Sequence, residues 1–382
     1  MYEYASRVMD VKPSATVRIS SLSKELKSRG EDIVDLSAGD PDFPTPDHIR
    51  DRAKTSLDEG QTHYTPANGV PELRDAIAQK LRNENDVPVS AEEIIVTPGA
   101  KQGLFEALFS LLEEGDEVVV FDPAWVSYES IVKMCGGSLS RVKLDVEDDF
   151  TLGDTDLAAA ITDETRAVIV NSPSNPTGAV FSRENLERIR DLAVDHDAWV
   201  IADEIYEKLT YGVDHVSLAS MDGMADRTVT INGFSKSHAM TGWRLGYYTA
   251  PDSLLTQTGK VQSHTVTCAT SFAQYGAVAA LNGPQEPVKK MQTLFEKRRD
   301  AAVDALLDRG IDVSYPDGAF YLFVPVDSQD DVAVCETLLK DEGVAVTPGS
   351  AFGISGYVRI SYANTQDRVV EGIERMAHRL DQ

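Results

Sequence analysis

Short apolar runs rich in β-branched residues recur through the middle of the chain. They are apolar almost without interruption, instead of alternating with polar residues. Strands of this kind are buried on both faces, which is typical of a mostly parallel sheet covered by helices. The predicted strands are residues 93–97, 117–121, 166–171, 198–202, 228–231 and 245–249.

Amphipathic segments lie between these runs. In the segment 102–114, Leu104, Leu108 and Leu111 recur at the spacing that places them on one helix face. Residues 183–196 have a similar pattern. Alternating strands and helices predict an α/β fold, with a sheet packed between layers of helices.

The pattern changes near Asn282-Gly283-Pro284, a plausible domain boundary. Beyond it, a long charged helix over 285–309 and short strands over 319–324 and 356–361 predict a smaller α+β domain. Near the other end, a helix-like stretch precedes residues 36–46, which are too rich in Pro and Gly for a regular element. The expected division is an N-terminal arm with part of the small domain over 1–44, a large domain over 45–284 and a small C-terminal domain over 285–382.

The charge balance is strongly acidic. There are 36 Lys and Arg residues against 62 Asp and Glu, a formal net charge of −26. Such a field repels nucleic acid and anionic membranes, so neither is an expected partner. Molar salt would screen this self-repulsion within about 3 Å. We therefore hypothesise a high-salt, halophilic cytoplasm; the alternative is an ordinary acidic mesophilic protein.

Other classes of protein find little support. No apolar run reaches the roughly 18 residues of a membrane-spanning helix, and the N-terminal residues lack the pattern of a secretory signal. Cys135, Cys268 and Cys335 are too few and scattered for a disulfide framework or a metal site. We therefore expect a cytoplasmic protein without a bound metal. The fingerprints of dinucleotide enzymes, P-loop NTPases and zinc proteases are absent.

The main chemical signal is Lys236, which follows the strand predicted at 228–231, with Arg244 eight residues later. An amine at a strand end can form a Schiff base with a carbonyl compound, and a guanidinium can hold a phosphate with two hydrogen bonds. Together they indicate pyridoxal phosphate. Taken alone, Lys236 would more often be a solvated surface lysine, and Arg244 an ordinary ion-pair partner, because most lysines are exposed.

Other segments indicate the same ligand. Residues 97–103 join a strand to a helix through small residues, which lets backbone N–H groups approach a phosphate. Residues 171–178 end another strand in a polar, proline-fixed turn. Asp203 directly follows a buried strand and is either a helix N-cap or the partner of a buried cation, such as a pyridinium nitrogen.

The ordered set of these motifs resembles the class I/II aminotransferases of fold type I, which depend on pyridoxal phosphate. The resemblance is strongest to the aspartate aminotransferase branch of bacteria and archaea and covers essentially the whole chain. It implies a seven-stranded, mostly parallel sheet in the large domain. The motifs are Lys12-Pro-Ser-Ala-Thr16, Ala38-Gly-Asp-Pro-Asp-Phe43, Tyr64-Thr-Pro-Ala-Asn-Gly69, Pro71-Glu-Leu-Arg74, Pro98-Gly-Ala-Lys101, Trp125-Val-Ser-Tyr128, Asn175-Pro-Thr-Gly178, Asp203-Glu-Ile-Tyr206, the segment 232–246 and Val358-Arg-Ile-Ser-Tyr-Ala363.

The resemblance implies three catalytic residues. Lys236 would bind the cofactor and later move a proton, and Asp203 would pair with the ring nitrogen. Tyr206, together with Asn175, would hydrogen-bond the phenolic oxygen of the ring. Trp125 would stack on the ring, although alone it could be a core aromatic.

It also implies residues that hold the phosphate and the substrate. The turn Gly99-Ala100-Lys101 and Arg244 would bind the phosphate, and Tyr64 would reach the phosphate of a neighbouring subunit in a homodimer. Many relatives carry a serine three residues before the lysine, where this chain has Gly233; Ser235 is expected to supply that hydroxyl. The substrate-binding set would be Gly39, Lys101, Trp125, Asn175 and Arg359, with Arg359 clamping the α-carboxylate.

The expected reaction is reversible, ping-pong transfer of an α-amino group from an amino acid to a 2-oxo acid. Lys101 would hold a distal carboxylate, which favours aspartate and glutamate with oxaloacetate and 2-oxoglutarate. It could instead serve only as a first-turn residue near the phosphate. The alternatives are an aromatic, alanine or prephenate-type aminotransferase, a β-lyase or decarboxylase using the same cofactor, and, least favoured, a cofactor-sensing regulator.

Overall fold

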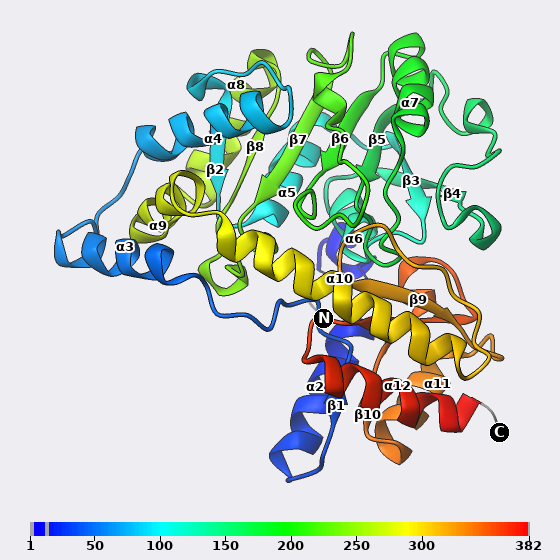
Figure 1. The fold of residues 1–382 in the computed structure, drawn as a ribbon. Helices are drawn as coiled ribbons and strands as arrows, with labels where there is room; N and C mark the ends of the chain where they lie inside the picture. The colour runs from blue at the N-terminus through cyan, green and yellow to red at the C-terminus, as the bar shows by residue number, and fades with distance from the viewer. Residues whose placement is uncertain (1–3, 12–14, 381–382) are drawn as a thin grey trace.

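The computed structural model describes residues 4–11 and 15–380, and its largest element is a seven-stranded sheet (Figure 1). The strand order is β2-β8-β7-β6-β5-β3-β4, and all neighbours run parallel except at β8, which is antiparallel to β2 and β7. Residues 12–14, the start of the first motif above, lie outside the described residues. The strands are β2 Ile94–Thr97, β3 Glu117–Asp122, β4 Ser138–Lys143, β5 Thr165–Asn171, β6 Trp199–Asp203, β7 Thr228–Gly233 and β8 Gly246–Thr249.

The predicted α/β class and the buried strands are confirmed; one strand of the large sheet was missed, and so were the two-residue strands at 34–35, 344–345 and 347–348. Strand β4 lies at the edge of the sheet, paired only with β3. Of its residues, only Val142 is buried, so β4 lacks the continuous apolar run that marks the inner strands. An edge strand needs little apolar surface, and its hydrogen bonds to β3 define it.

Alternate residues of each inner strand face two different cores. Ile95, Val120 and Ile201 pack with α5, α6 and α8 on one face. Their neighbours Val96 and Val200 face cores built with α4 and α9 or with α7 on the other. Because helices cover both faces of the sheet, most side chains along the inner strands are apolar. Polar side chains gather where these strands end.

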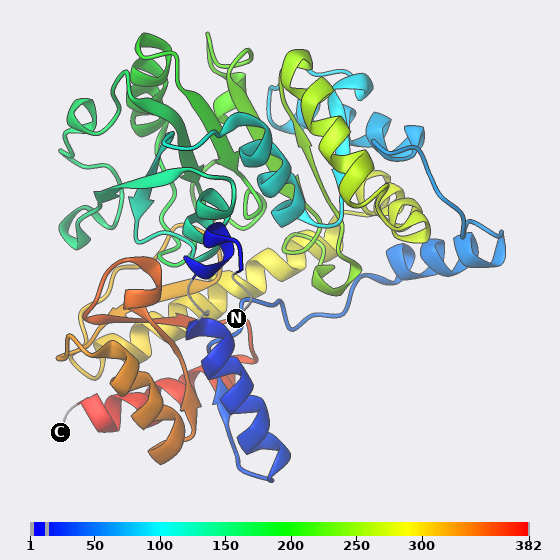
Figure 2. The same cartoon turned by 180° about the vertical axis from the view of Figure 1, so that it is seen from behind.

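Twelve α-helices occupy the described residues, and Figures 1 and 2 show them on both faces of the sheet and around the smaller strands. The helices predicted at 102–114, 183–196 and 285–309 correspond to α5, α7 and α10. The helices are α1 Ser6–Met9, α2 Ala15–Ser28, α3 Asp47–Asp58, α4 Pro71–Glu84, α5 Ala100–Leu111, α6 Ser127–Met134, α7 Arg183–Asp195, α8 Asp252–Thr265, α9 Ser271–Asn282, α10 Glu286–Leu307, α11 Asp331–Asp341 and α12 Gln366–Leu380. In this described part of the chain, no helix combines the length and hydropathy needed to cross a membrane.

The N-terminal and C-terminal segments share a second core. Strands β11 (Thr347–Pro348), β12 (Tyr357–Ser361) and β9 (Tyr321–Pro325) form an antiparallel sheet, and β1 (Val34–Asp35) pairs with β10 (Val344–Ala345) in parallel. Apolar residues of α2, α10, α11 and α12 pack with these strands. The irregular connection 36–46 runs from β1 toward α3, as predicted. The domain boundaries remain a prediction, since α10 runs alongside both parts (Figure 1).

Candidate active site

A cavity of about 620 Å³ opens where the parallel strands β5, β6 and β7 end and the strands β9 and β12 approach them. The carboxyl edge of a parallel sheet is the usual place for a ligand in such folds. Predicted site residues from distant parts of the sequence line this cavity. They are Gly39, Ala100, Lys101, Trp125, Asn175, Asp203, Tyr206, Ser235, Lys236, Arg244 and Arg359.

Asp203 is the last residue of β6, and its side chain is buried. Its Oδ2 accepts a hydrogen bond of 2.8 Å from the hydroxyl of Tyr128. Residues 205–208 form a turn, so Asp203 caps no helix there. Burial raises the pKa of Asp203 to about 6 despite the hydrogen bond from Tyr128. A carboxylate desolvated in this way is stabilised by a cationic partner, which supports the second of the two interpretations of Asp203.

Lys236 follows β7 and extends into the cavity. Its Nζ donates a hydrogen bond of 2.5 Å to the carbonyl of Gly39. Burial lowers the pKa of Lys236 to about 8; Asp40 opposes the shift, and the positive charges of Arg359 and Arg244 add to it. The neutral amine, which is the nucleophilic and basic form, is therefore far more populated near neutral pH than it is for a solvated lysine.

The turn before α5 and the guanidinium of Arg244 form one cradle. Gly99 has φ = 86°, and a Cβ added to it would lie 2.6 Å from Nη2 of Arg244. A Cβ added to Gly246 would lie 2.4 Å from the backbone nitrogen of Ala100. Glycine at both positions thus keeps the N-terminus of α5 and Arg244 close together. Backbone N–H groups and a guanidinium that converge in this way suit a phosphate.

Arg359, on β12, is buried, with its side chain only 4% exposed. Its Nη1 donates to Oδ1 of Asn175 at 2.9 Å, and its Nη2 donates to the carbonyl of Ser37 at 2.6 Å. Burial lowers the pKa of Arg359. Its Nε has no hydrogen-bond partner, and among the described residues no carboxylate contributes to its pKa, which only Tyr321 and Tyr206 raise. A desolvated guanidinium without a counter-ion is suited to bind an anion that enters the cavity.

Lys101 lies in the first turn of α5, directed toward α6. Its Nζ donates to Oγ of Ser127 at 3.2 Å and lies 4.6 Å from the centre of the Trp125 ring. Burial and then the charge of Arg244 lower its pKa. The side chain therefore borders both the phosphate cradle and the part of the cavity beside Trp125.

Two predicted site residues do not line the cavity. Gly99 lies against the guanidinium of Arg244, within contact distance of it. Tyr64 is 87% exposed and borders a separate pocket beside Cys268 and Phe272. A single chain does not bring Tyr64 to the main cavity, so its role at a shared site stays a prediction.

Several cavity residues had no role in the sequence interpretation. Tyr128 stood in the quoted motif after Trp125, and its contact with Asp203 across 75 residues was not foreseen. Tyr321, on β9, lines the cavity and touches Tyr206 and Arg359. Asn171 and Lys24 also border it. Adjacent motifs could have marked Tyr128 as a candidate, whereas Tyr321 resembles any other aromatic residue of a buried strand.

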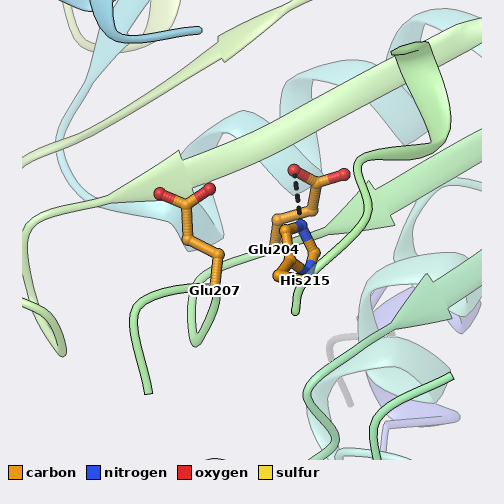
Figure 3. A group of neighbouring side chains, drawn as sticks. All are labelled: Glu204, Glu207 and His215. Carbon is orange, nitrogen blue, oxygen red and sulfur yellow. Dashed lines mark ion pairs between the residues drawn. The ribbon is translucent and has the colours of Figure 1, made fainter. Parts of the chain in front are cut away.

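Charged side chains form a cluster in and beside the segment that follows Asp203 (Figure 3). Glu204, Glu207 and His215 present ligand atoms within 4.8 Å of one another, and Figure 3 shows the imidazole beside the Glu204 carboxylate. The Nζ of Lys80 and the side chain of Asn85 both bond to Glu207. Burial alone would lower the pKa of His215, but Glu204 and Glu207 outweigh it and raise this pKa. Lys80 and, when it is protonated, His215 therefore balance the two carboxylates.

The cavity residues fit pyridoxal phosphate. The buried carboxylate of Asp203 matches a pyridinium nitrogen, the partly neutral Lys236 matches an aldehyde, and the cradle around Arg244 matches a phosphate. Arg359, whose Nε is unpaired among the described residues, is left for a second anion, such as a substrate carboxylate.

Comparison with known proteins identifies the family. Residues 31–376 match the model for aminotransferase class I and II. A probable aspartate/prephenate aminotransferase of Aquifex aeolicus is 43% identical, over 99% of this chain and 98% of the relative. An aspartate aminotransferase of Bacillus subtilis is 42% identical, over 97% of each chain.

Solved structures agree with this result. The aspartate aminotransferase from Thermus thermophilus with maleate superposes with a TM-score of 0.95 at 40% identity, covering 99% of this chain and all of that chain. The expected family, the fold and the cofactor are thereby confirmed. The chain belongs to the class I and II aminotransferases, and its cofactor is pyridoxal 5′-phosphate.

Proposed function

We propose that this aminotransferase moves α-amino groups between aspartate or glutamate and the acceptors 2-oxoglutarate and oxaloacetate. The observation that carries the proposal is that, besides Arg244 at the phosphate cradle and Lys24 at the border, the cavity presents Arg359 and Lys101 near the amine of Lys236. A dicarboxylic amino acid has two anionic groups for these two cations. The names of the relatives from Bacillus subtilis and Thermus thermophilus support the same substrate class.

Lys236 and Arg359 act on the substrate. Arg359 binds the α-carboxylate through its guanidinium, while Asn175 and the Ser37 carbonyl keep that guanidinium in place. Lys236, whose lowered pKa makes the neutral amine accessible near neutral pH, removes the proton from the substrate Cα. The bound cofactor supplies the electron sink that stabilises the resulting negative charge. The second half of the ping-pong cycle uses the same groups with a 2-oxo acid.

The remaining residues would hold the cofactor. Asp203 would keep a proton on the ring nitrogen, because a buried carboxylate stabilises a nearby positive charge. Tyr206 and Asn175, which line the cavity, would donate toward the phenolic oxygen, and Trp125 would cover the ring. The N-terminus of α5 and Arg244 would hold the phosphate together with Ser235, another residue of the cavity lining.

A second candidate function is amino transfer to prephenate or to an aromatic 2-oxo acid. The relative from Aquifex aeolicus carries both substrates in its name. Prephenate also bears two carboxylates, so the same pair of cations would suit it. A β-lyase would keep every cofactor residue but would release ammonia and would not amino-transfer to 2-oxoglutarate.

The test is a panel of amino donors assayed with 2-oxoglutarate as acceptor. We expect aspartate to give the highest kcat/KM, with alanine and phenylalanine well below it. The reverse reaction, with glutamate as donor and either oxaloacetate or prephenate as acceptor, separates the two candidates. A higher kcat/KM for alanine or phenylalanine than for aspartate would contradict the proposed substrate class.

We further propose a homodimer in which Tyr64 serves the cavity of the neighbouring subunit. The exposure of Tyr64 and its position away from its own cavity support this. Mixed dimers of a Tyr64→Phe chain and a Lys236→Ala chain provide the test. One of the two sites of a mixed dimer then lacks both residues and the other lacks neither, so the purified mixed dimer should keep about half of the wild-type activity, whereas a Tyr64 that served its own site would leave no intact site.

We also propose that the protein works in a cytoplasm with high salt. The net charge of −26 supports this, and the free thiols of Cys135, Cys268 and Cys335 suit a reducing compartment. Running the donor panel at about 0.1 M and 2 M KCl tests the salt dependence, because screening at molar salt removes the long-range repulsion between acidic groups. Equal activity and stability at both concentrations would contradict it, and fractionation of cells tests the compartment.

A further inference from the structure

Tyr321 contacts both a residue proposed to bind the cofactor, Tyr206, and the residue proposed to bind the substrate carboxylate, Arg359. It belongs to β9, is 1% exposed and lines the cavity. Its hydroxyl lies 2.8 Å from the hydroxyl of Tyr206. Its ring lies under the guanidinium of Arg359, with Cζ of the arginine 4.5 Å from the ring centre. One side chain thus touches a proposed cofactor residue at one end and the proposed carboxylate clamp along its face.

The sheet explains the contact with Arg359. Strands β9 and β12 are antiparallel, with Tyr321 opposite Ser361 and Phe323 opposite Arg359. Tyr321 and Arg359 are therefore diagonal neighbours on one face of the sheet, a spacing that long side chains can bridge. The positive charge over the ring is attracted by the negative π face. The same register that builds the small sheet therefore also sets the direction of the guanidinium.

The contact with Tyr206 bridges the two parts of the molecule. Tyr206 follows β6 of the large sheet, whereas Tyr321 belongs to the small sheet. The two rings meet edge to face, with centroids 5.8 Å apart. A Cβ added to Gly39 would lie 2.4 Å from the Tyr321 hydroxyl, so that hydroxyl occupies the space that a side chain at position 39 would need. The carbonyl of the same glycine accepts the hydrogen bond from Lys236.

We infer that Tyr321 is a positioning residue that orders Tyr206 through its hydroxyl and Arg359 through its ring. This inference rests on the proposed roles of these two residues. When the hydroxyl of Tyr206 donates a hydrogen bond to a ligand oxygen, the hydroxyl of Tyr321 donates a hydrogen bond to the oxygen of Tyr206. A hydroxyl that accepts one hydrogen bond donates the next more strongly. The ring keeps the guanidinium aligned for a carboxylate without supplying a competing negative charge.

Two substitutions separate the two contacts. Tyr321→Phe removes the hydroxyl and keeps the ring, whereas Tyr321→Leu removes both. In the holoenzyme, Tyr321→Phe should move the pH midpoint of the cofactor's visible absorbance upward by about half a unit, because Tyr206 then withdraws less electron density from the phenolic oxygen. The KM for aspartate should stay within about twofold. Tyr321→Leu should shift the midpoint similarly and raise that KM about tenfold, because the guanidinium loses the ring beneath it.

A matched control is Tyr211→Phe. Tyr211 is another buried tyrosine of the same core, and its hydroxyl bonds the carbonyl of Ala319. The Tyr211→Phe variant should change the thermal stability without moving the pH midpoint of the cofactor absorbance or the KM for aspartate. If Tyr321→Phe behaves like Tyr211→Phe, Tyr321 is only a core aromatic and the inference is wrong. If the wild-type protein neither shows the cofactor absorbance nor transfers amino groups, the proposed function itself fails instead. Tyr321→Phe preserves the ring and the packing, so the test does not depend on whether the leucine variant folds.

Discussion

The hydroxyl of Tyr128 donates a hydrogen bond of 2.8 Å to Oδ2 of Asp203, and both side chains are buried. Tyr128 is at the start of α6, and Asp203 ends β6, so the bond links a helix on one face of the sheet to the carboxyl edge where the cavity opens. It orients the carboxylate, whose other oxygen, Oδ1, accepts only a long hydrogen bond of 3.4 Å from the backbone N–H of Ile205.

Replacing either partner should weaken catalysis to different degrees. Asp203→Asn removes the negative charge and should reduce kcat by about 10³-fold or more. Tyr128→Phe removes one hydrogen bond to a charged group, worth about 1.5 kcal/mol, and should reduce kcat by about tenfold. Steady-state kinetics of the double variant supply the control. Tyr128→Phe should have little further effect once Asp203 is Asn, whereas fully multiplicative losses would show that Tyr128 acts independently of Asp203.

The lowered pKa of Lys236 predicts the pH dependence of cofactor binding. Only the neutral amine attacks an aldehyde, and burial lowers the pKa of Lys236 to about 8. The rate at which the cofactor-free protein binds pyridoxal phosphate covalently should therefore rise with pH below about 8 and level off above it. Stopped-flow absorbance measures this rate. A rate that keeps rising toward pH 10 would show an ordinary, solvated lysine.

Lys236→Ala provides the complementary measurement. This variant should bind the cofactor through the phosphate cradle without a covalent bond, and transamination should fall below detection. Its melting temperature in the presence of the cofactor should stay near that of the wild type, because Arg244 and the N-terminus of α5 are unchanged. Turnover near the wild-type value would contradict the role of Lys236.

Lys101 should determine the preference for acidic substrates. Lys101→Ala removes one charged donor, so kcat/KM for aspartate should fall about tenfold or more, while kcat/KM for alanine stays within about twofold. Lys133→Ala is the matched control, because Lys133 is a lysine of α6 engaged in an ion pair with Glu129. Equal losses for aspartate and alanine in Lys101→Ala would indicate that Lys101 serves only the phosphate.

The buried pair of His215 and Glu204 should make stability depend on pH. The pKa of His215 is raised in the folded protein, so the pair stabilises the fold fully below the unfolded-state pKa of about 6.5. This contribution is lost as the pH rises through the folded-state pKa. The free energy of unfolding of His215→Asn relative to wild type should thus show its largest deficit near pH 6 and a smaller one near pH 9.

Denaturant titrations at fixed salt measure this difference, with His264→Asn as the control because His264 is exposed on α8. The control should show no such trend. A deficit for His215→Asn that is independent of pH would mean that the residue contributes packing alone.

The sequence by itself determined the class of fold and much of the cofactor chemistry. The inner strands, including β5 and β6, are marked by uninterrupted apolar runs, because both of their faces are buried. Lys236, Asp203 and Arg244 stand at strand ends within recognisable motifs, and these positions meet at one edge of a parallel sheet. Local patterns were sufficient there because the chemistry lies where secondary structure starts or stops.

Only the tertiary structure decided which side chains support that chemistry. The edge strand β4 has little apolar pattern, since its hydrogen bonds to β3 rather than its burial define it. Tyr128 reaches Asp203, and Tyr321 reaches Tyr206, across 75 and 115 residues. The lowered pKa of Lys236 arises from burial and from charges brought close by folding. Such contacts depend on the packing of elements distant in the sequence, which no local spacing encodes.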